Sequence, residues 1–297
     1  MSKELLVVFD IDETLIHFIS KQYTHLFTDL SDEVQEQFNY IRDGDSIILL
    51  RPHLRELFDF YKSNPNIKVA LWTYSEQEYS DNIGNLLVDY LGLDEDFFLF
   101  KYGAEQVLEA SPDEDEPKKL TKIYEDFPQF NTFNTFLVDD APSNIKHEIN
   151  KQNCLLIQPF APFSVDKVRQ DLGEDGIQIA LNDNILTDVK DISKIVYDDI
   201  SGCSMEDIEE CFASEPVFSK ARVERMGLSR LFKKYVKPPI YELLTIGKPK
   251  QSKNFTMIGG KKKKKKKKKT IKRKLKKKKS KKKKHKKKSI IKYKRKK

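Results

Sequence analysis

Two acidic pairs, a hydroxyl group and an ammonium group follow short apolar runs of this chain. Asp10 and Asp12 come after the first run, and the later polar residues are Thr73, Lys118, Asp139 and Asp140. The carboxyl ends of parallel strands meet at one edge of a sheet, so carboxylates from two strands are expected to converge there. Four carboxylates would repel one another unless a cation lay among them, and Mg²⁺ suits hard oxygen ligands of this kind. The sequence therefore predicts a Mg²⁺ site made by the two acidic pairs.

These residue types match the needs of phosphoryl transfer. An aspartate carboxylate can attack phosphorus to form an acyl-phosphate, which divides one difficult step into two easier ones. A second carboxyl group can protonate the leaving alkoxide and later deprotonate water. A hydroxyl and an ammonium group can hold the remaining phosphoryl oxygens, where the negative charge lies. Asp10, Asp12, Thr73 and Lys118 supply one group of each kind.

Five apolar runs of four or five residues are the elements that would position these groups. They are Leu5–Phe9, Lys68–Trp72, Phe97–Phe100, Thr135–Val138 and Cys154–Ile157. None alternates strictly between apolar and polar residues, which is typical of strands covered on both faces in a parallel sheet. Helical patterns separate the runs. The expected fold class is therefore α/β, a doubly wound, Rossmann-like parallel sheet of five strands.

The intervals between the runs predict helices, an insertion and an uncapped site. Helices are expected over 53–62 and 185–200, and from Pro142 toward Asn150. Another is expected from a capping box at Ser75 and Glu78 to about Tyr90. A further helix is expected from Pro117 toward Tyr124, with Lys118 and Lys119 in its opening turn. Residues 15–50 are expected to form a flap insertion, with a helix at 31–40 and a strand at Ser46–Leu50. Residues 74–117 leave no room for a large cap domain.

The segments that carry these polar residues resemble a known family. Val7–His17 is similar to the D-x-D-x-T motif of the haloacid-dehalogenase superfamily. More narrowly, it resembles the NLI-interacting-factor-like branch of phosphatases that act on the RNA polymerase II C-terminal domain, with D-x-D-E-T-L-[VI]-H. Leu50–Leu54, Trp72–Ser75 and Phe136–Pro142 agree with later motifs of that branch, in the same order. The resemblance covers about residues 1–200.

The resemblance implies a role for each candidate residue. It makes Asp10 the nucleophile and Asp12 the general acid/base, whose backbone carbonyl also binds Mg²⁺. Thr73 and Lys118 would bind the phosphoryl group, and the metal site would comprise Asp10, Asp139 and Asp140. The family usually follows its lysine with Asp-Leu, whereas Lys118 is followed by Lys119-Leu120, so the choice between the two lysines stays open. The implied substrate is phosphoserine or phosphothreonine on a protein.

Charge divides the chain into an acidic body and a basic tail. Residues 261–297 hold 28 of the 55 Lys and Arg residues and no acid, so 1–260 carry 27 basic against 46 acidic residues, a net charge of −19. We expect a phosphatase domain at 1–200, a mainly helical extension at 201–258 and a disordered lysine-rich tail at 259–297. The extension is expected to hold helices at Met205–Phe212 and Ser219–Tyr235.

The tail predicts charge-driven binding to nucleic acid or another polyanion, with little readout of base sequence. A nucleic-acid-end (3′) phosphatase of the same mechanism, or a non-catalytic scaffold, are the alternatives to a protein phosphatase. The tail also resembles those on proteins of large DNA viruses.

Three cysteines without metal-type spacing, Cys154, Cys203 and Cys211, favour a reducing, intracellular compartment. The basic tail adds the expectation of a nuclear or nucleic-acid-associated location. No run approaches the roughly 18–20 apolar residues of a membrane helix, so no membrane partner is expected.

Overall fold

The computed structural model describes residues 3–110, 118–145, 150–163, 173–204 and 215–235. The predicted tail at 259–297, the predicted helix at Met205–Phe212 and the predicted helix start at Pro117 lie outside these residues. Residues 146–149 of the helix predicted from Pro142 toward Asn150 also lie outside them, and the described residues of that range are assigned as turn.

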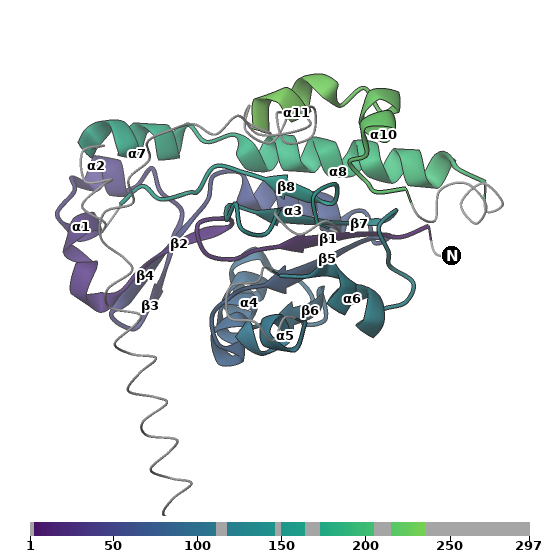
Figure 1. The fold of residues 1–297 in the computed structure, drawn as a ribbon. Coiled ribbons are helices and arrows are strands. Elements are labelled where there is room, and N and C mark those ends of the chain that lie inside the picture. The colour runs from purple at the N-terminus through teal and green to yellow at the C-terminus, as the bar shows by residue number, and fades with distance from the viewer. Residues whose placement is uncertain (1–2, 111–117, 146–149, 164–172, 205–214, 236–297) are drawn as a thin grey trace, which may run out of the picture. The chain divides into compact units, whose positions relative to one another are not determined.

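The centre of the molecule is a parallel sheet of five strands (Figure 1). The strands are β1 (Leu5–Phe9), β5 (Ile67–Trp72), β6 (Phe98–Tyr102), β7 (Thr135–Asp139) and β8 (Cys154–Leu156), in the order β6-β5-β1-β7-β8. The predicted sheet is confirmed, with boundaries shifted by one or two residues. From β1 the chain adds β5 and then β6 on one side, and it then crosses to the other side of β1 to add β7 and β8. The switch point of the sheet therefore lies between β1 and β7.

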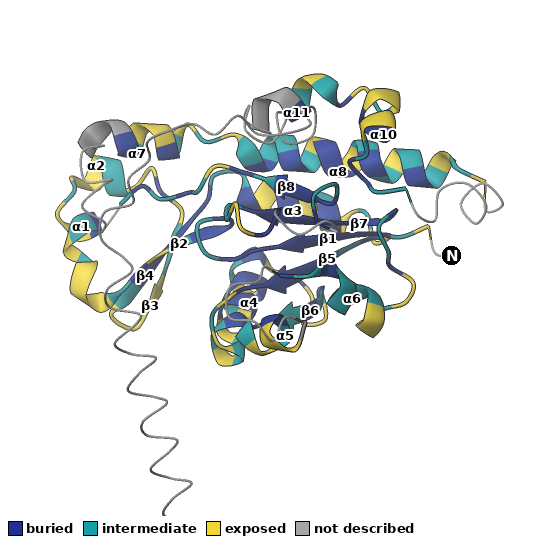
Figure 2. Cartoon of the chain, in the orientation of Figure 1, coloured by how far each residue is buried: buried dark blue, intermediate teal, exposed yellow. Residues whose placement is uncertain are grey.

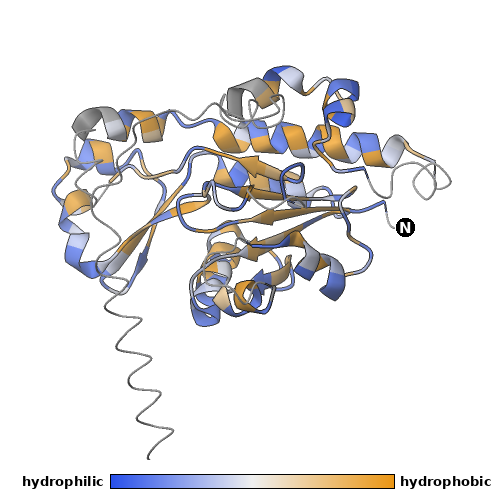
Figure 3. Cartoon of the chain, viewed as in Figure 1, coloured by the Kyte–Doolittle hydropathy of each residue, from blue (hydrophilic) through white to orange (hydrophobic). Residues whose placement is uncertain are grey.

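Helices cover both faces of the sheet, as a doubly wound fold requires. Along β1, alternate side chains enter two separate apolar clusters: Leu5, Val7 and Phe9 in one, Leu6 and Val8 in the other. The first cluster includes α3 (Leu54–Lys62) and α8 (Ile185–Gly202), and the second includes α5 (Ala104–Ala110) and α6 (Leu120–Asp126). The central strands are therefore buried, as Figure 2 shows, and rich in apolar residues, as Figure 3 shows.

The insertion after β1 is a small antiparallel sheet of three strands. Its strands are β2 (Ile16–Ile19), β3 (Tyr40–Asp43) and β4 (Ser46–Leu50), in the order β2-β4-β3. One-turn helices η1 (Lys21–Tyr23), α1 (His25–Thr28) and α2 (Asp32–Gln35) join β2 to β3. The flap is confirmed, but the helix predicted at 31–40 forms only over the one turn of α2. Gly44, with φ +54°, turns the chain into a hairpin, and pairing of β3 with β4 fixes Tyr40 as strand.

Two predicted helix starts are also wrong, because the residues involved bond elsewhere. Helix α4 (Gln77–Leu91) has Glu76 at its N-cap and no side-chain capping bond there, so the Ser75–Glu78 capping box is absent. The Ser75 carbonyl instead accepts from the amide of Ala104, 2.7 Å away. Helix α6 begins at Leu120, so Lys118 lies before the helix and not in its first turn.

The described C-terminal segment packs on the same core as the sheet. It contains α10 (Lys220–Arg225) and α11 (Ser229–Tyr235), and α7 (Gly173–Leu181) precedes α8. The continuous helix predicted over Ser219–Tyr235 is interrupted at Gly227, whose φ is +69°. The buried side chains from this segment that join the α3–α8 cluster are Val217, Phe218, Val223, Leu228 and Phe232. Among the described helices, none combines the length and apolar character needed to cross a bilayer.

Candidate active site

The turn after β1 and the end of β7 bring three aspartates together. Phe9 of β1 pairs with Val138 of β7, so Asp10 and Asp139 leave adjacent strands at the same edge. The amide of Asp10 donates to the carbonyl of Val138 over 2.9 Å, which fixes this register up to the site. One carboxylate oxygen from each of Asp10, Asp139 and Asp140 lies within 4.8 Å of the other two. Asp10 of the first acidic pair and both members of the second pair therefore converge at the switch point of the sheet, whereas Asp12 is not part of this cluster.

Lys118 lies inside this cluster. Its Nζ donates to Asp10 Oδ1 and, over 2.9 Å, to Asp139 Oδ2, and its side chain is fully buried. Lys119 instead occupies the N-cap of α6 and is only partly buried. Burial disfavours the charged form of Lys118, but the two carboxylates outweigh it and raise the pKa of the ammonium group. Of the two lysines between which the sequence left the choice open, Lys118 is thus the one that reaches the aspartates.

The cluster has more negative charge than Lys118 can balance. Burial raises the pKa of Asp10 well above its usual value, Lys118 lowers it in part, and Asp139 raises it further. Burial, together with Asp139 and Glu13, raises the pKa of Asp140 to about 6. Three carboxylates and one ammonium group leave two net negative charges when all are ionised. The oxygen donors and the excess charge both fit a divalent cation.

The carboxylate of Asp12 is bonded by residues that follow β5 and that open α4. Thr73, which follows β5, donates from Oγ1 to Asp12 Oδ2 over 3.3 Å. Tyr79 in the first turn of α4 donates from its hydroxyl to Asp12 Oδ1 over 2.5 Å. Burial and the carboxylate of Asp12 raise the pKa of Tyr79, which keeps the phenol protonated as a donor. Sequence reasoning gave Tyr79 no role, although it follows closely after Trp72–Ser75, the segment that resembles the family motif around Thr73.

A fully buried amide, Asn144, connects Lys118 with Asp139. Asn144 Nδ2 donates to Asp139 Oδ2 over 2.7 Å, while its Oδ1 accepts from the Lys118 amide at 3.0 Å and the Tyr74 hydroxyl at 3.1 Å. Asn150 in turn donates to the carbonyls of Asn144 and Lys118. These asparagines were missed, because a sequence gives no sign that an amide in a turn is buried. Their bonds hold Lys118 in an extended segment before α6.

The turn that carries Asp12 is supported from the flap by Arg51. Glu13 adopts a left-handed conformation, with φ 59°, and the amides of Thr14 and Leu15 both donate to the Ile11 carbonyl. The Arg51 guanidinium donates to the Thr14 carbonyl over 2.9 Å and to Asp183 Oδ2 over 2.7 Å. Arg51 therefore links the end of β4, the turn after β1 and the residues before α8.

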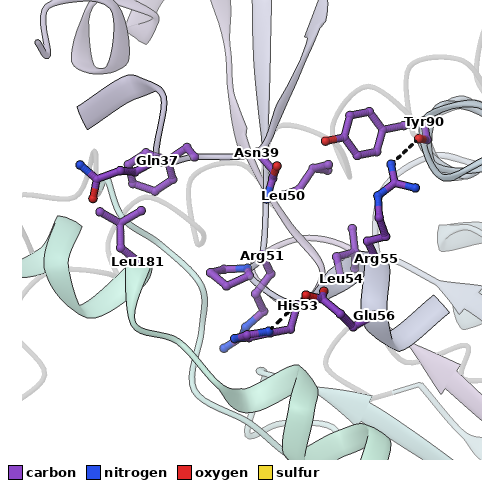
Figure 4. A pocket seen from close by; sticks show the side chains of 12 residues that line it. Gln37, Asn39, Leu50, Arg51, His53, Leu54, Arg55, Glu56, Tyr90 and Leu181 are labelled. Carbon is purple, nitrogen blue, oxygen red and sulfur yellow. Dashed lines mark hydrogen bonds and ion pairs between the residues drawn. The ribbon is translucent and has the colours of Figure 1, made fainter. Parts of the chain in front are cut away.

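A separate cavity of about 330 Å³ lies beside the flap (Figure 4). Residues at the end of β4 and the start of α3 line it, including Arg51, His53 and Arg55, together with Tyr90 from α4. Its charged groups already have partners within the protein. Arg55 donates to the Tyr90 carbonyl over 2.9 Å, and His53 Nε2 lies 3.1 Å from Asn184 Oδ1. None of the six predicted site residues lines this cavity.

Comparisons with known proteins place the chain in a family. A solved structure of Fcp1, an essential RNA polymerase II CTD phosphatase, matches with a TM-score of 0.44 and 13% identity over 72% of this chain and 68% of that one. The fission yeast CTD phosphatase Fcp1 bound to beryllium fluoride matches with a TM-score of 0.37 and 12% identity, over 79% of this chain and 65% of that one. No curated protein matches the chain. The model of the NLI interacting factor-like phosphatases matches residues 5–180, more than half of the chain. The chain therefore belongs to the NLI interacting factor-like phosphatase family, a branch of the haloacid-dehalogenase superfamily.

Proposed function

We propose that this protein is a Mg²⁺-dependent phosphatase that hydrolyses phosphoserine or phosphothreonine on proteins through an aspartyl-phosphate at Asp10. The observation that carries the proposal is the bonding of Lys118 to both Asp10 and Asp139 at the switch point of the sheet. A buried ammonium group beside the carboxylate that would attack supplies positive charge where phosphoryl oxygens would lie. Membership of a phosphatase family supports the reaction class.

The side chains of Asp10, Asp139 and Asp140, with the backbone carbonyl of Asp12, would hold the Mg²⁺. When bound, the ion neutralises charge on the phosphoryl oxygens and on the aspartates. Ala141 and Asn144 each donate to a different oxygen of Asp139, both over 2.7 Å, so this ligand is held by the protein before any ion binds. Such support of a ligand's own carboxylate is usual around metal sites.

In the proposed reaction, an Asp10 carboxylate oxygen attacks phosphorus while the bond from phosphorus to the serine or threonine oxygen breaks. Asp12 gives its proton to that leaving oxygen. Water then attacks the phosphorus of the aspartyl-phosphate, and Asp12 takes the proton from the water. The bond from phosphorus to the Asp10 oxygen breaks, which restores the Asp10 carboxylate and releases inorganic phosphate. Lys118 and Thr73 hold the non-bridging oxygens during both steps.

The open approach to the site favours a protein as the substrate. Between Thr73 and residue 110, the described chain contains only α4, β6 and α5, which are elements of the main fold. Tyr74, next to Thr73, remains 45% exposed. A site without a large cover admits a phosphorylated residue on a macromolecule, whereas small metabolites usually need closure to exclude water.

The first test is phosphate release from a phosphoserine peptide by the full chain with Mg²⁺ at pH 5–7, with Asp10→Asn and Asp45→Asn compared. Asp10→Asn removes the attacking oxygen and is expected to lower turnover by at least about a thousandfold, since loss of a nucleophile forfeits most of covalent catalysis. Asp45 is an exposed aspartate paired with Lys21 in the flap, so its variant controls for the loss of one carboxylate. Equal turnover by wild type and Asp10→Asn would contradict the mechanism.

The basic tail favours one alternative substrate, a 3′-phosphorylated nucleic acid. Its 28 basic residues would bind a phosphate backbone and so concentrate nucleic-acid ends near the site. A 3′-phosphorylated oligonucleotide is therefore assayed beside the peptide. Release from the oligonucleotide alone would retain the mechanism and change the substrate class. It would also strengthen the case for a nuclear or nucleic-acid-associated location.

A further inference from the structure

Tyr79 makes a direct bond to Asp12 that is much shorter than the bond from Thr73 to the same carboxylate. We propose that Tyr79 is a positioning residue that fixes the Asp12 carboxylate by Oδ1 and so assigns proton transfer to Oδ2. This inference rests on the proposed function, because it concerns how Asp12 delivers its proton to the leaving group.

The two oxygens of Asp12 have different partners. Oδ1 accepts from the Tyr79 hydroxyl at 2.5 Å, whereas Oδ2 accepts, among the described residues, a long bond of 3.3 Å from Thr73. A phenol is protonated at neutral pH and can donate to Oδ1 whether or not Asp12 carries a proton. The Thr73 hydroxyl has one proton to donate, and a phosphoryl oxygen at the site would compete for it. Tyr79 is therefore the partner that stays with Asp12 through the reaction, and Oδ2 is the oxygen left to exchange a proton.

Tyr79 can serve in this way because two elements hold its ring. Its amide donates to the Glu76 carbonyl over 3.0 Å, which places it in the first turn of α4. Its ring meets Phe18 of β2 edge-on, with centroids 6.2 Å apart and planes at 82°. The helix holds the backbone of Tyr79 and the flap contacts its ring, and precise placement of this kind is what proton transfer requires.

The assignment defines the path of the proton. As the bond from phosphorus to the leaving oxygen breaks, its electron pair stays on that oxygen, which takes the proton from Asp12 Oδ2. The resulting carboxylate keeps the Tyr79 bond on Oδ1. In the second step, Oδ2 takes a proton from the attacking water. An acidic phenol can leave a phenyl phosphate as the phenolate, without help from this proton. A phenol of higher pKa is a poor leaving group and needs the proton.

The test compares Tyr79→Phe with wild type on a series of substituted phenyl phosphates and a phosphoserine peptide, with Mg²⁺ present. The expected result is a loss in kcat/KM of about tenfold or more for the peptide and the poorest phenols, and less than about threefold for p-nitrophenyl phosphate. The plot of log kcat/KM against leaving-group acidity therefore becomes steeper. The matched control is Tyr102→Phe, which removes the same kind of hydroxyl-to-aspartate bond, from Tyr102 to Asp126, and leaves the bond from the Thr73 amide to the Tyr102 backbone carbonyl in place. This control should keep the wild-type slope.

A second variant loosens the placement of the Tyr79 ring without removing the Tyr79 hydroxyl. Phe18 is 37% exposed, so Phe18→Ala should fold, and it frees the phenol ring on one side. It is expected to steepen the slope in the same direction, but by less than Tyr79→Phe.

A loss that is equal across all leaving groups, or no loss, would overturn the positioning role and leave the phosphatase function intact. Failure of the wild-type chain on every substrate would overturn the phosphatase function, and the positioning role with it.

Discussion

At the scale of single residues, the balance of charge explains the composition of the site. Lys118 is shared between Asp10 and Asp139, which are both buried, whereas Asp140 is only partly buried. The carboxylate of Asp140 is thus the one most dependent on a bound cation for neutralisation. The residue types of this cluster could be predicted from the sequence, because carboxylates after apolar runs have few other uses at a sheet edge. The asparagines and the tyrosine that hold them could not, since their roles depend on contacts between distant turns.

Asp140 should set the pH dependence of metal binding. Its pKa of about 6 in the metal-free protein means that it is ionised above pH 6 and increasingly protonated below. A proton then competes with the metal, so Mg²⁺ affinity should be constant above about pH 7 and approach a tenfold loss per pH unit well below pH 6. Asp140→Asn should bind Mg²⁺ at least about tenfold more weakly at pH 7.5 and lose part of this pH dependence.

Calorimetric titration of Mg²⁺ into the chain at several pH values measures both effects. Asp126→Asn is the control, because Asp126 lies outside the cluster and bonds Lys122 and Tyr102. Unchanged affinity in Asp140→Asn would remove this residue from the metal site.

At the scale of elements, Arg51 joins three parts of the fold that are far apart in sequence. Its side chain is fully buried, and that of Asp183 is 10% exposed. Arg51→Met keeps most of the volume but leaves the Asp183 carboxylate and the Thr14 carbonyl without their donor. Breaking a buried pair in this way costs about 3–5 kcal/mol. The exposed pair of Lys21 and Asp45 is the comparison, and Lys21→Met should cost less than about 1 kcal/mol.

Urea unfolding of both variants measures the difference in the free energy of unfolding. Similar losses for the two variants would show that Arg51 does not brace the turn after β1.

The elements also show where sequence reasoning succeeds and where it stops. The five strands were predicted because burial on both faces leaves an unbroken apolar run, as in Leu5–Phe9. The flap helix predicted at 31–40 forms only as the one turn of α2, and the pairing of β3 with β4 makes its last residue, Tyr40, part of a strand. The helix start at Lys118 was wrong because buried Asn144 and Asn150 bind its backbone. Errors thus occur where tertiary hydrogen bonds decide a boundary.

At the scale of the whole molecule, the body and the tail carry opposite net charges, and this difference predicts how the chain binds DNA. The body carries −19 over 1–260, and the tail adds 28 positive charges without one acid. Contact with about ten phosphates would release enough counterions to give a slope near −9 in log affinity against log salt. The full chain should therefore bind double-stranded DNA with this steep salt dependence, and a chain ending at Gly260 should not. Because the proposed site lies wholly within the body, both chains should hydrolyse a short phosphopeptide equally.

Filter binding at several salt concentrations and peptide turnover, measured on both chains, test these expectations together. The acidic body could bind the basic tail in competition with nucleic acid, and the same measurements can detect this binding. Faster peptide turnover after truncation, reversed by adding a peptide of residues 261–297, would show that the tail binds the body instead. Salt would then weaken the inhibition in parallel with its effect on DNA binding, since both would depend on the same lysines.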